Sequence, residues 1–324
     1  MKKTRSPYIF SYFFTALLII QSYSCSTDKN KKSPPNLIVF IADDVSWDDL
    51  GCYGNEYVQS PNIDLLAKDG IIFKNAYLTT SSCSPSRNSI ITGRYPHNTG
   101  AAELHTMPPM DMISLPEILK SKGYFTLQAG KFHMGDYAIR GFDEVHDDKI
   151  INGKGGEEYW EEAIENTPND QPFFMWFASY DAHRTWGENQ FTGTHNVNEI
   201  KVPEYLIDGP ETRLDLVNYY DEITRFDYYI GEVVKKLKEK GVYENTVIVI
   251  MADNGRPFPH SKTRVNHQGV KTPFIVHYPK AIAARNTVNE SLVSAVDIAP
   301  TLTDLAGIDP IERFQGVSFK KLLL

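Results

Sequence analysis

The fold of this chain can be predicted from the stretch Asn36-Leu37-Ile38-Val39-Phe40-Ile41-Ala42, which is followed at once by Asp43-Asp44. It is a continuous apolar run rich in β-branched side chains, which is typical of a strand buried on both faces of a sheet. Such strands belong to parallel sheets that are covered on each side by helices. The two aspartates then mark the carboxyl end of this first strand.

Later runs of the same character are separated by segments with helical periodicity. Further strands are predicted over residues 124–129, 172–179, 246–252 and 273–278. Helices are predicted to begin after the N-cap residues Ser60 and Ser114, and the longest spans 211–240, with apolar residues at three- and four-residue spacing. We therefore expect an α/β fold with a mostly parallel sheet covered by helices on both faces.

Composition places the chain among globular proteins. Of its 324 residues, 41% are apolar, 23% charged and 12% aromatic, which excludes disordered, collagen-like and coiled-coil proteins. The net charge of −8 argues against a general nucleic-acid binder, so an anionic substrate would need a local cluster of cations. Three cysteines are too few for a disulfide framework.

The N-terminus has the features of an export signal. A basic segment over 1–5 precedes an apolar run over 8–20 that is too short to span a bilayer comfortably, and small residues stand before Cys25. We predict a signal peptide over 1–24, a polar tether over 25–35 and one folded domain over 36–324. Two destinations are open, a cell-envelope lipoprotein with a lipid on Cys25 or a soluble periplasmic protein. A buried N-terminal helix is the structural alternative.

Unusual polar residues follow four of the predicted strands. Because ligand sites of such sheets lie beyond the carboxyl ends of the strands, these residues are expected to meet at one edge. They are Asp43 and Asp44, Lys131 and His133, Asp181 and His183, and Asp253 and Asn254.

The chemistry of this set indicates a metal ion next to an anion. Oxygen donors on Asp43, Asp44, Asp253 and Asn254 suit a hard cation such as Ca²⁺ or Mg²⁺ better than Zn²⁺. The alternative is that each pair forms only a strand-end cap or turn. The nearby groups that carry positive charge or a proton fit a tetrahedral oxyanion such as sulfate or phosphate, unless they are ordinary solvated side chains. They are Arg87, Lys131, His133, His183 and Lys262.

The most specific stretch runs from Ser82 to Arg94, SCSPSRNSIITGR. Its Ser-Pro-Ser-Arg turn is expected to start a short helix, so that Cys83 faces backbone N–H groups at the positive helix end. Two interpretations of Cys83 are open at this point: an activated thiolate, or a small hydrophobic residue in a helix cap.

Cys83-x-Pro85-Ser86-Arg87, followed by Thr92-Gly93-Arg94, resembles the signature of type I sulfatases. Other family motifs occur in the family's order at 43–44, 50–54, 130–135 and 253–255, and the resemblance runs from about residue 36 to 322. Residues 253–259, 262–264 and 269–273 are most similar to the sulfamidase branch, which bacterial sulfatases of algal polysaccharides such as ulvan also resemble.

The resemblance implies an alkaline-phosphatase-like fold and a specific role for each of the matched site residues. Cys83 would be oxidised to formylglycine by a formylglycine-generating or sulfatase-maturating enzyme. One Ca²⁺ would be bound by residue 83 together with Asp43, Asp44, Asp253 and Asn254. In the family, Arg87 and Lys131 match the groups that hold the formylglycine hydrate, and His133 matches the base for its second hydroxyl. His183 and Lys262 match groups that face the sulfate and the leaving oxygen.

The expected function is removal of sulfate, as an ester or an N-sulfate, from a polysaccharide or its oligosaccharides, such as ulvan or a glycosaminoglycan. One hydroxyl of the hydrate would attack sulfur, and the other would later expel sulfate. Two alternatives remain, a phosphodiester or phosphonate hydrolase of the same superfamily and a non-catalytic glycan-binding relative. Family members usually continue beyond a segment like 316–319 into a small C-terminal domain, and this domain is expected to be missing here.

Residues next to the matched positions have weaker assignments. Arg184, Arg256 and His260 are hypothesised to contact sugar or a neighbouring sulfate, and the segment 95–97 to line the substrate mouth. Cys52 is interpreted as a packed structural thiol. Asp297 is predicted to cap a helix.

Overall fold

The computed structural model of the protein describes residues 33–282 and 285–324. The chain divides into two units, Met1–Ser33 and Pro34–Leu324, and the fold described here is that of the second. The predicted signal peptide and most of the predicted tether lie outside the described residues. Among the helices in the described ranges, none combines the length and apolar character that a bilayer span requires.

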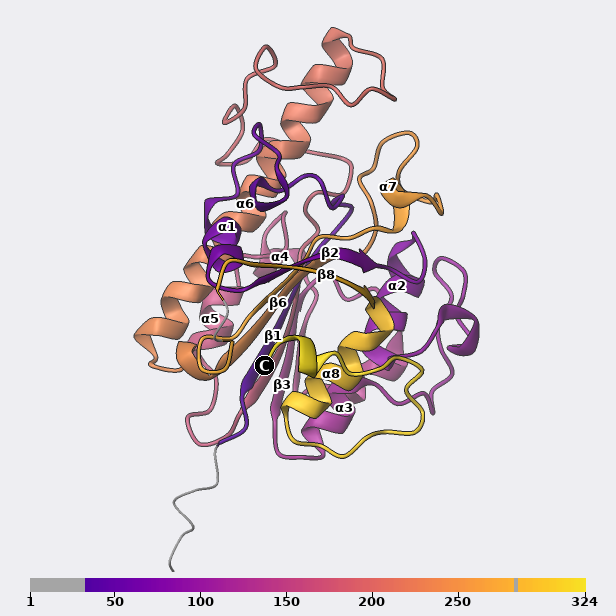
Figure 1. Cartoon of the computed structure of the whole chain (residues 1–324), viewed down its shortest axis with the longest axis vertical. Helices are drawn as coiled ribbons and strands as arrows, with labels where there is room; N and C mark the ends of the chain where they lie inside the picture. The colour runs from indigo at the N-terminus through magenta and orange to yellow at the C-terminus, as the bar shows by residue number, and fades with distance from the viewer. Residues whose placement is uncertain (1–32, 283–284) are drawn as a thin grey trace, which may run out of the picture. The chain divides into compact units, whose positions relative to one another are not determined.

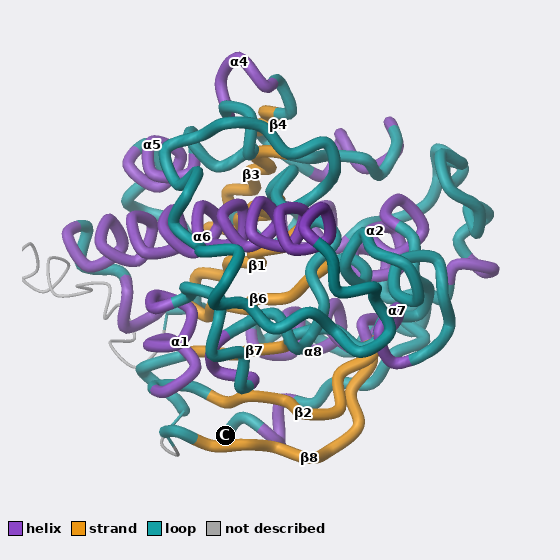
Figure 2. Tube along the Cα trace, turned by 90° about the horizontal axis from the view of Figure 1, so that it is seen from above, coloured by secondary structure: helices purple, strands orange, loops and turns teal. Residues whose placement is uncertain are grey.

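One eight-stranded sheet runs through the second unit in the order β4-β3-β5-β1-β6-β7-β2-β8. Its strands are β1 (Asn36–Ala42), β2 (Ile71–Tyr77), β3 (Phe125–Gly130), β4 (Glu144–His146), β5 (Phe173–Ala178), β6 (Thr246–Ala252), β7 (Phe274–His277) and β8 (Thr287–Ser294). The opening run is the central strand, and Val39 pairs with Trp176 of β5 on one side and Val249 of β6 on the other. Figure 2 follows the sheet from β4 and β3 on one side to β2 and β8 on the other.

The prediction of a mostly parallel sheet is confirmed, with one exception in direction. β7 runs antiparallel to both of its neighbours, β6 and β2, whereas the remaining pairs are parallel. All five predicted strands are present within one or two residues of their expected bounds. Three strands, β2, β4 and β8, were not predicted. β4 is only three residues long, and β8 alternates half-buried and exposed residues along the sheet edge.

Helices cover both faces of the sheet (Figure 1). On one face lie α1 (Pro61–Lys68), α5 (Trp160–Glu165) and α6 (Pro210–Glu239), and on the other α2 (Cys83–Thr92), α3 (Leu115–Lys120) and α8 (Ile298–Leu305). Two one-turn helices, α4 (Lys149–Asn152) and α7 (His267–Val270), lie in loops. Alternate β1 residues pack into the two cores: Phe40 faces α5 and α6, while Val39 faces the opposite layer.

The N-terminus of α1 is satisfied differently from the prediction. Ser60 makes no side-chain capping bond; its hydroxyl accepts from the Gly51 N–H at 2.9 Å instead. The free N–H groups of Asn62 and Ile63 donate to the Asp227 carboxylate on α6, at 3.2 and 2.7 Å. The capping carboxylate therefore comes from a distant helix and ties α1 to α6.

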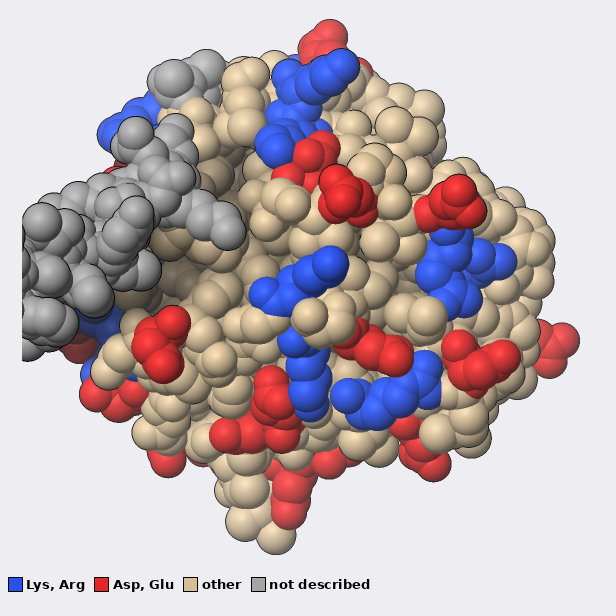
Figure 3. Space-filling model, turned by 90° about the horizontal axis from the view of Figure 1, so that it is seen from below, with Lys and Arg blue, Asp and Glu red and all other residues tan. Residues whose placement is uncertain are grey.

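Charged side chains of both signs share the surface. On the face seen from below in Figure 3, lysines and arginines are interspersed with aspartates and glutamates rather than gathered by sign. A mixed surface of this kind accords with the modest net charge of −8.

Candidate active site at the carboxyl ends of the strands

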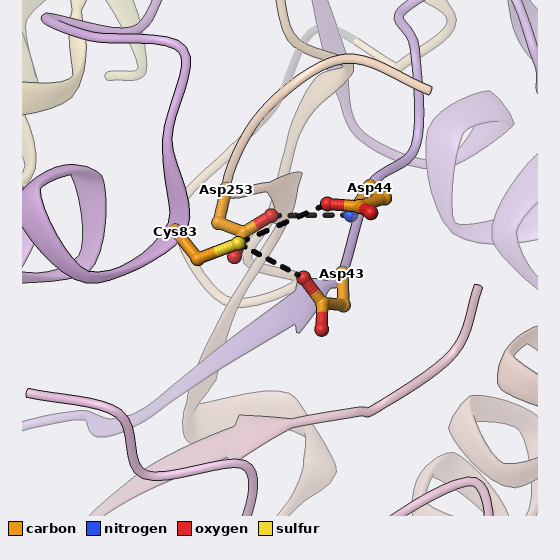
Figure 4. Close-up of side chains that lie close together, drawn as sticks. All are labelled: Asp43, Asp44, Cys83 and Asp253. Atoms are coloured by element: carbon orange, nitrogen blue, oxygen red, sulfur yellow. Dashed lines mark hydrogen bonds between the residues drawn. The ribbon is translucent and has the colours of Figure 1, made fainter. Parts of the chain in front are cut away.

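Four side chains from three distant segments converge where β1 and β6 end (Figure 4). Asp43 and Asp44 follow β1, Asp253 follows β6, and Cys83 is the first residue of α2. One ligand atom from each of the four lies within 4.8 Å of the others, and all four residues are buried. The Cys83 thiol lies 3.7 Å from Asp43 Oδ1 and 3.9 Å from Asp44 Oδ1.

Backbone geometry at Asp44 helps to form this cluster. Asp44 has φ of 65°, in the left-handed region that aspartate tolerates better than most side chains. Its N–H donates to Asp253 Oδ1 at 3.1 Å, which joins the ends of β1 and β6. The pair therefore does more than end a strand, because its backbone and its carboxylate both face the cluster.

Each of the three carboxylates faces a cation. Arg87, one helical turn after Cys83, donates from Nε to Asp253 Oδ2 at 2.9 Å. Lys131 pairs with Asp43, and Lys262 Nζ lies 2.7 Å from Asp44 Oδ2. Burial lowers the pKa of Lys131, but the neighbouring Asp43 outweighs it and leaves that pKa above its ordinary value. The structure thus brings the predicted anionic and cationic residues into one buried network.

The donor atoms fit a hard divalent cation. Three carboxylates supply oxygen, and the Asn254 side chain, also buried, donates from Nδ2 to Asp44 Oδ1 at 2.6 Å. Asn254 Oδ1 is buried without a hydrogen-bond partner among the described residues, as expected of an acceptor built for another ligand. Oxygen-rich sets of this kind suit Ca²⁺ or Mg²⁺ rather than a thiolate-seeking metal.

The environment of Cys83 argues against an activated thiolate. Burial raises the pKa of the Cys83 thiol, and the carboxylates of Asp253 and Asp43 raise that pKa further, beyond what Lys131 offsets. Of the two interpretations left open by the sequence, the unmodified side chain therefore matches the protonated, buried thiol.

His133 has a histidine partner that sequence reasoning missed. Its Nε2 lies 3.0 Å from Nδ1 of His105, and its Nδ1 is buried without a partner among the described residues. Burial first, and then Lys131 and Arg87, lower the pKa of His133 to about 4. His105 lies in a loop after α2 and belongs to no motif, so only the fold could reveal it. Its backbone N–H donates to Ser84 Oγ at 2.9 Å, which holds this loop next to Cys83.

His183 lies at the mouth of the network. Its Nε2 is 4.0 Å from Asp44 Oδ2, and its side chain is 43% exposed. His183, Asp43 and Lys131 line one end of a cavity of about 610 Å³, within the range typical of small-molecule sites. His183 thus has both access to a ligand and contact with the buried groups.

The residues with weaker assignments separate into different environments. Arg256 is buried and ion-paired with Asp48 and with Asp49, at 3.0 Å for the latter, and it does not line the cavity beside His183, so its assignment as a sugar contact stays a prediction. Burial and this pairing make it a structural cation. Arg184 does line the cavity, where it pairs with Asp215. His260 is exposed and contacts Asn266 at 3.1 Å, away from the cavity lining.

Three minor predictions concern structural groups. Asp297 caps as expected, because its Oδ2 accepts from the Ser294 N–H at 2.8 Å in a capping box. Cys52 is half-buried and packs against the core, in agreement with a structural thiol. Tyr95 stacks on His97 with ring centroids 5.9 Å apart, and neither belongs to the cavity lining.

Comparison with known proteins places this geometry in a family. A family model described as Sulfatase matches residues 35–308. The chain is 29% identical over 306 residues to N-sulphoglucosamine sulphohydrolase of Homo sapiens, covering 84% of this chain and 60% of that protein. It is 31% identical over 291 residues to an ulvan-active sulfatase of Formosa agariphila, covering 89% and 57%. The chain thus spans about 60% of the length of these curated relatives.

A solved structure has the same fold. The crystal structure of Ps i-CgsB in complex with k-i-k-neocarrahexaose superimposes with a TM-score of 0.73 at 26% sequence identity. The match covers 88% of this chain and 75% of that one. The eight-stranded sheet with its two helical layers is therefore a fold shared with these proteins.

Proposed function

The chain belongs to the sulfatase family, whose model matches residues 35–308, and from this premise we propose that it hydrolyses sulfate groups on a carbohydrate polymer or its oligosaccharides. One observation carries the proposal: Cys83 lies among three buried carboxylates, each paired with a cation. A protein that only needed a stable core would rarely collect six charges at one point, four of them buried, because burying charge is costly.

Asp43, Asp44, Asp253 and Asn254, together with residue 83, would hold one Ca²⁺. The ion would supply positive charge that polarises a sulfate oxygen and favours a deprotonated hydroxyl at neutral pH. The unpartnered Asn254 Oδ1 and the oxygen-only donor set of the other three support this assignment.

Residue 83 would act as formylglycine after oxidation of the cysteine by a maturating enzyme. The hydrated aldehyde would supply a hydroxyl nucleophile that the protonated thiol lacks. The raised pKa of Cys83 supports the need for this conversion. Exposure of the motif to a maturating enzyme would precede folding, since Cys83 is buried in the folded chain.

The surrounding residues would bind the anionic oxygens and transfer protons. Arg87 and Lys131 would hold the oxygens of residue 83, and Lys262 would face a sulfate oxygen from the opposite side. His133 is neutral above its pKa of about 4 and can therefore accept a proton. His183, exposed at the cavity, would donate a proton to the leaving oxygen or nitrogen.

A sulfated saccharide is the substrate that the relatives support. Both curated relatives are named for sulfohydrolase or sulfatase activity, one on N-sulphoglucosamine and one on ulvan. The cavity beside His183 has room for a sugar ring. Export to the cell envelope, as a lipoprotein or in the periplasm, would bring the enzyme to such polymers.

Peptide mass spectrometry of the residue-83 fragment tests the chemistry directly. Protein produced together with a formylglycine-generating enzyme should show a loss of about 18 Da at residue 83. The same protein should release sulfate from members of a panel of sulfated glycans. The Cys83→Ala variant, with the same fold, should release none. An intact thiol under these conditions would reject the formylglycine mechanism and favour the non-catalytic glycan-binding alternative.

Sulfate and phosphate esters must also be compared in the same assay. Among the described residues only one cluster has the donors for a metal ion, whereas two-metal phosphatases need a second set. Faster release of phosphate than of sulfate from matched esters would favour the phosphodiester or phosphonate hydrolase instead.

A further inference from the structure

The cavity beside His183 extends beyond the residues that the proposed chemistry uses. Its lining also includes Lys149 and Lys154, which belong to no sulfatase motif. Lys149 opens α4, a one-turn helix that Figure 2 shows next to β4. Lys154 follows two residues after the end of that helix. Both residues are exposed, so their ammonium groups are available to a ligand in the cavity.

The acidic groups of the same cavity are already neutralised. Asp181 is buried and paired with Arg225, and Glu222 Oε1 lies 3.8 Å from the same guanidinium. Burial, and then the neighbouring Asp181 carboxylate, raise the pKa of Glu222. Asp43 pairs with Lys131. Asp43 and Asp181 therefore already have cationic partners other than the two lysines.

Lys149 and Lys154 form no ion pair within the described part of the chain. Among the described residues, no carboxylate oxygen lies within 4 Å of either ammonium group; Lys149 instead lies over the Tyr180 ring, 4.3 Å from its centroid. Arg184, the other exposed cation of the wall, is neutralised by Asp215. Two positive charges without an ion-pair partner among the described residues therefore line the same cavity as Asp43, Lys131 and His183.

The loop that carries Lys154 is held firmly in place. The carbonyl of Gly155 accepts from the Tyr180 N–H at 2.7 Å. A Cβ at Gly155 would come within 2.5 Å of Arg225 Nε, so only glycine allows this close approach. Lys154 is therefore held close to Tyr180 and Arg225, which also line the cavity.

We propose that Lys149 and Lys154 form a subsite for a second anionic group on the substrate, so that the preferred saccharide carries a carboxylate or another sulfate besides the sulfate that is removed. This inference rests on the proposed function and narrows its substrate class. A neutral sugar would leave the two lysines without partners, whereas a second anion would form charge-assisted hydrogen bonds with them.

The test compares the double variant Lys149→Gln/Lys154→Gln with the wild-type enzyme on three matched disaccharides. One is monosulfated and otherwise neutral, one carries a sulfate and a uronate, and one carries two sulfates. For each dianionic substrate, kcat/KM is divided by kcat/KM for the monosulfated disaccharide. This ratio should fall about 10- to 100-fold in the double variant. Lys122→Gln, an exposed lysine after α3 and outside the cavity, should leave these ratios unchanged.

The three substrates also identify the second anion. A fall confined to the uronate substrate would assign the subsite to a carboxylate, and a fall confined to the disulfated one to a sulfate. Equal ratios in the double variant, the Lys122→Gln control and the wild type would overturn the proposal.

A binding measurement separates this proposal from the proposed function. Calorimetry with Cys83→Ala protein should show weaker binding of the dianionic saccharides when Lys149 and Lys154 are also replaced by Gln. Weaker binding without any turnover by the wild-type enzyme would support the subsite while rejecting the sulfatase activity. Turnover by the wild type with unchanged binding in the lysine variant would support the sulfatase activity while rejecting the subsite.

Discussion

His133 lies beside two cations and a second imidazole, and these neighbours set its protonation state. Burial, Lys131 and Arg87 all disfavour the imidazolium, which is why its pKa is lowered to about 4. The ring is therefore neutral across the range in which an ordinary histidine gains its charge. At the scale of a single residue, the neighbours of His133 thus decide its charge.

Titration of labelled histidines tests this directly. Between pH 8 and pH 5 the His133 ring should keep the chemical shifts of a neutral imidazole, and it should gain a proton only as the pH falls towards 4. The measurement is a two-dimensional NMR titration of ¹⁵N-histidine protein, with His133→Gln to assign the resonance. His97, assigned in the same way, supplies an internal reference. A midpoint near 6.5 for His133 would contradict the prediction.

The sign of the effect on stability follows from the same shift. The unfolded chain binds a proton at this histidine near its ordinary pKa of 6.5, whereas the folded chain does so only near 4. As the pH falls from 6.5 to 4, the unfolded state therefore binds more protons, and the free energy of unfolding decreases.

At the scale of elements, α1 depends on α6 for its N-terminal cap. Asp227 accepts from the N–H groups of Asn62 and Ile63 and from Asn62 Nδ2, the last at 2.8 Å. Burial raises the pKa of Asp227 to about 7, because the carboxylate lies inside the interface between the two helices. Gly231 lies in the same interface, where a Cβ would come within 2.5 Å of Asn62 Oδ1.

Replacing this distant cap should cost more than replacing the local one. Asp227→Ala leaves two buried N–H groups without an acceptor and should lower the free energy of unfolding by about 1–3 kcal/mol. Ser60→Ala should have a smaller effect, since Ser60 makes no capping bond. Denaturant unfolding followed by circular dichroism measures both variants. A larger loss in Ser60→Ala than in Asp227→Ala would contradict the assignment.

At the scale of the whole molecule, the proposed cation would join segments that are far apart in the sequence. Asp43 and Asp253 come from the ends of two neighbouring central strands, and Cys83 comes from a helix on one face of the sheet. An ion that binds only this assembled set stabilises the folded state by about 2.7 kcal/mol at a free concentration of 100 times its Kd.

Calcium should therefore raise the thermal midpoint of the chain by several degrees, and a chelator should reverse the rise. Differential scanning calorimetry in Ca²⁺ and in chelator measures the difference. Asp253→Asn weakens the donor set and should reduce the shift strongly, whereas Asp64→Asn, a carboxylate outside the cluster, should preserve it. Equal midpoints with and without Ca²⁺ would count against the metal site.

The amino-acid pattern alone is enough to predict the buried strands, their helical cover and the residues that gather at the strand ends. Continuous apolar runs such as 36–42 report burial on both faces, and the carboxyl ends of parallel strands must share an edge, so Asp43 and Asp253 could be placed together from the pattern alone. The resemblance of the segment around Cys83 to the sulfatase signature then supplied the chemistry expected there.

Which residues become partners across long distances in the sequence is known only from the folded chain. The His105–His133 contact, the Asp227 cap on α1 and the burial of Arg256 against Asp49 leave no periodic signal in the sequence. The reversed direction of β7 is equally absent from it. Periodicity reports the local environment of a residue, whereas these features depend on which surfaces meet after the chain has folded.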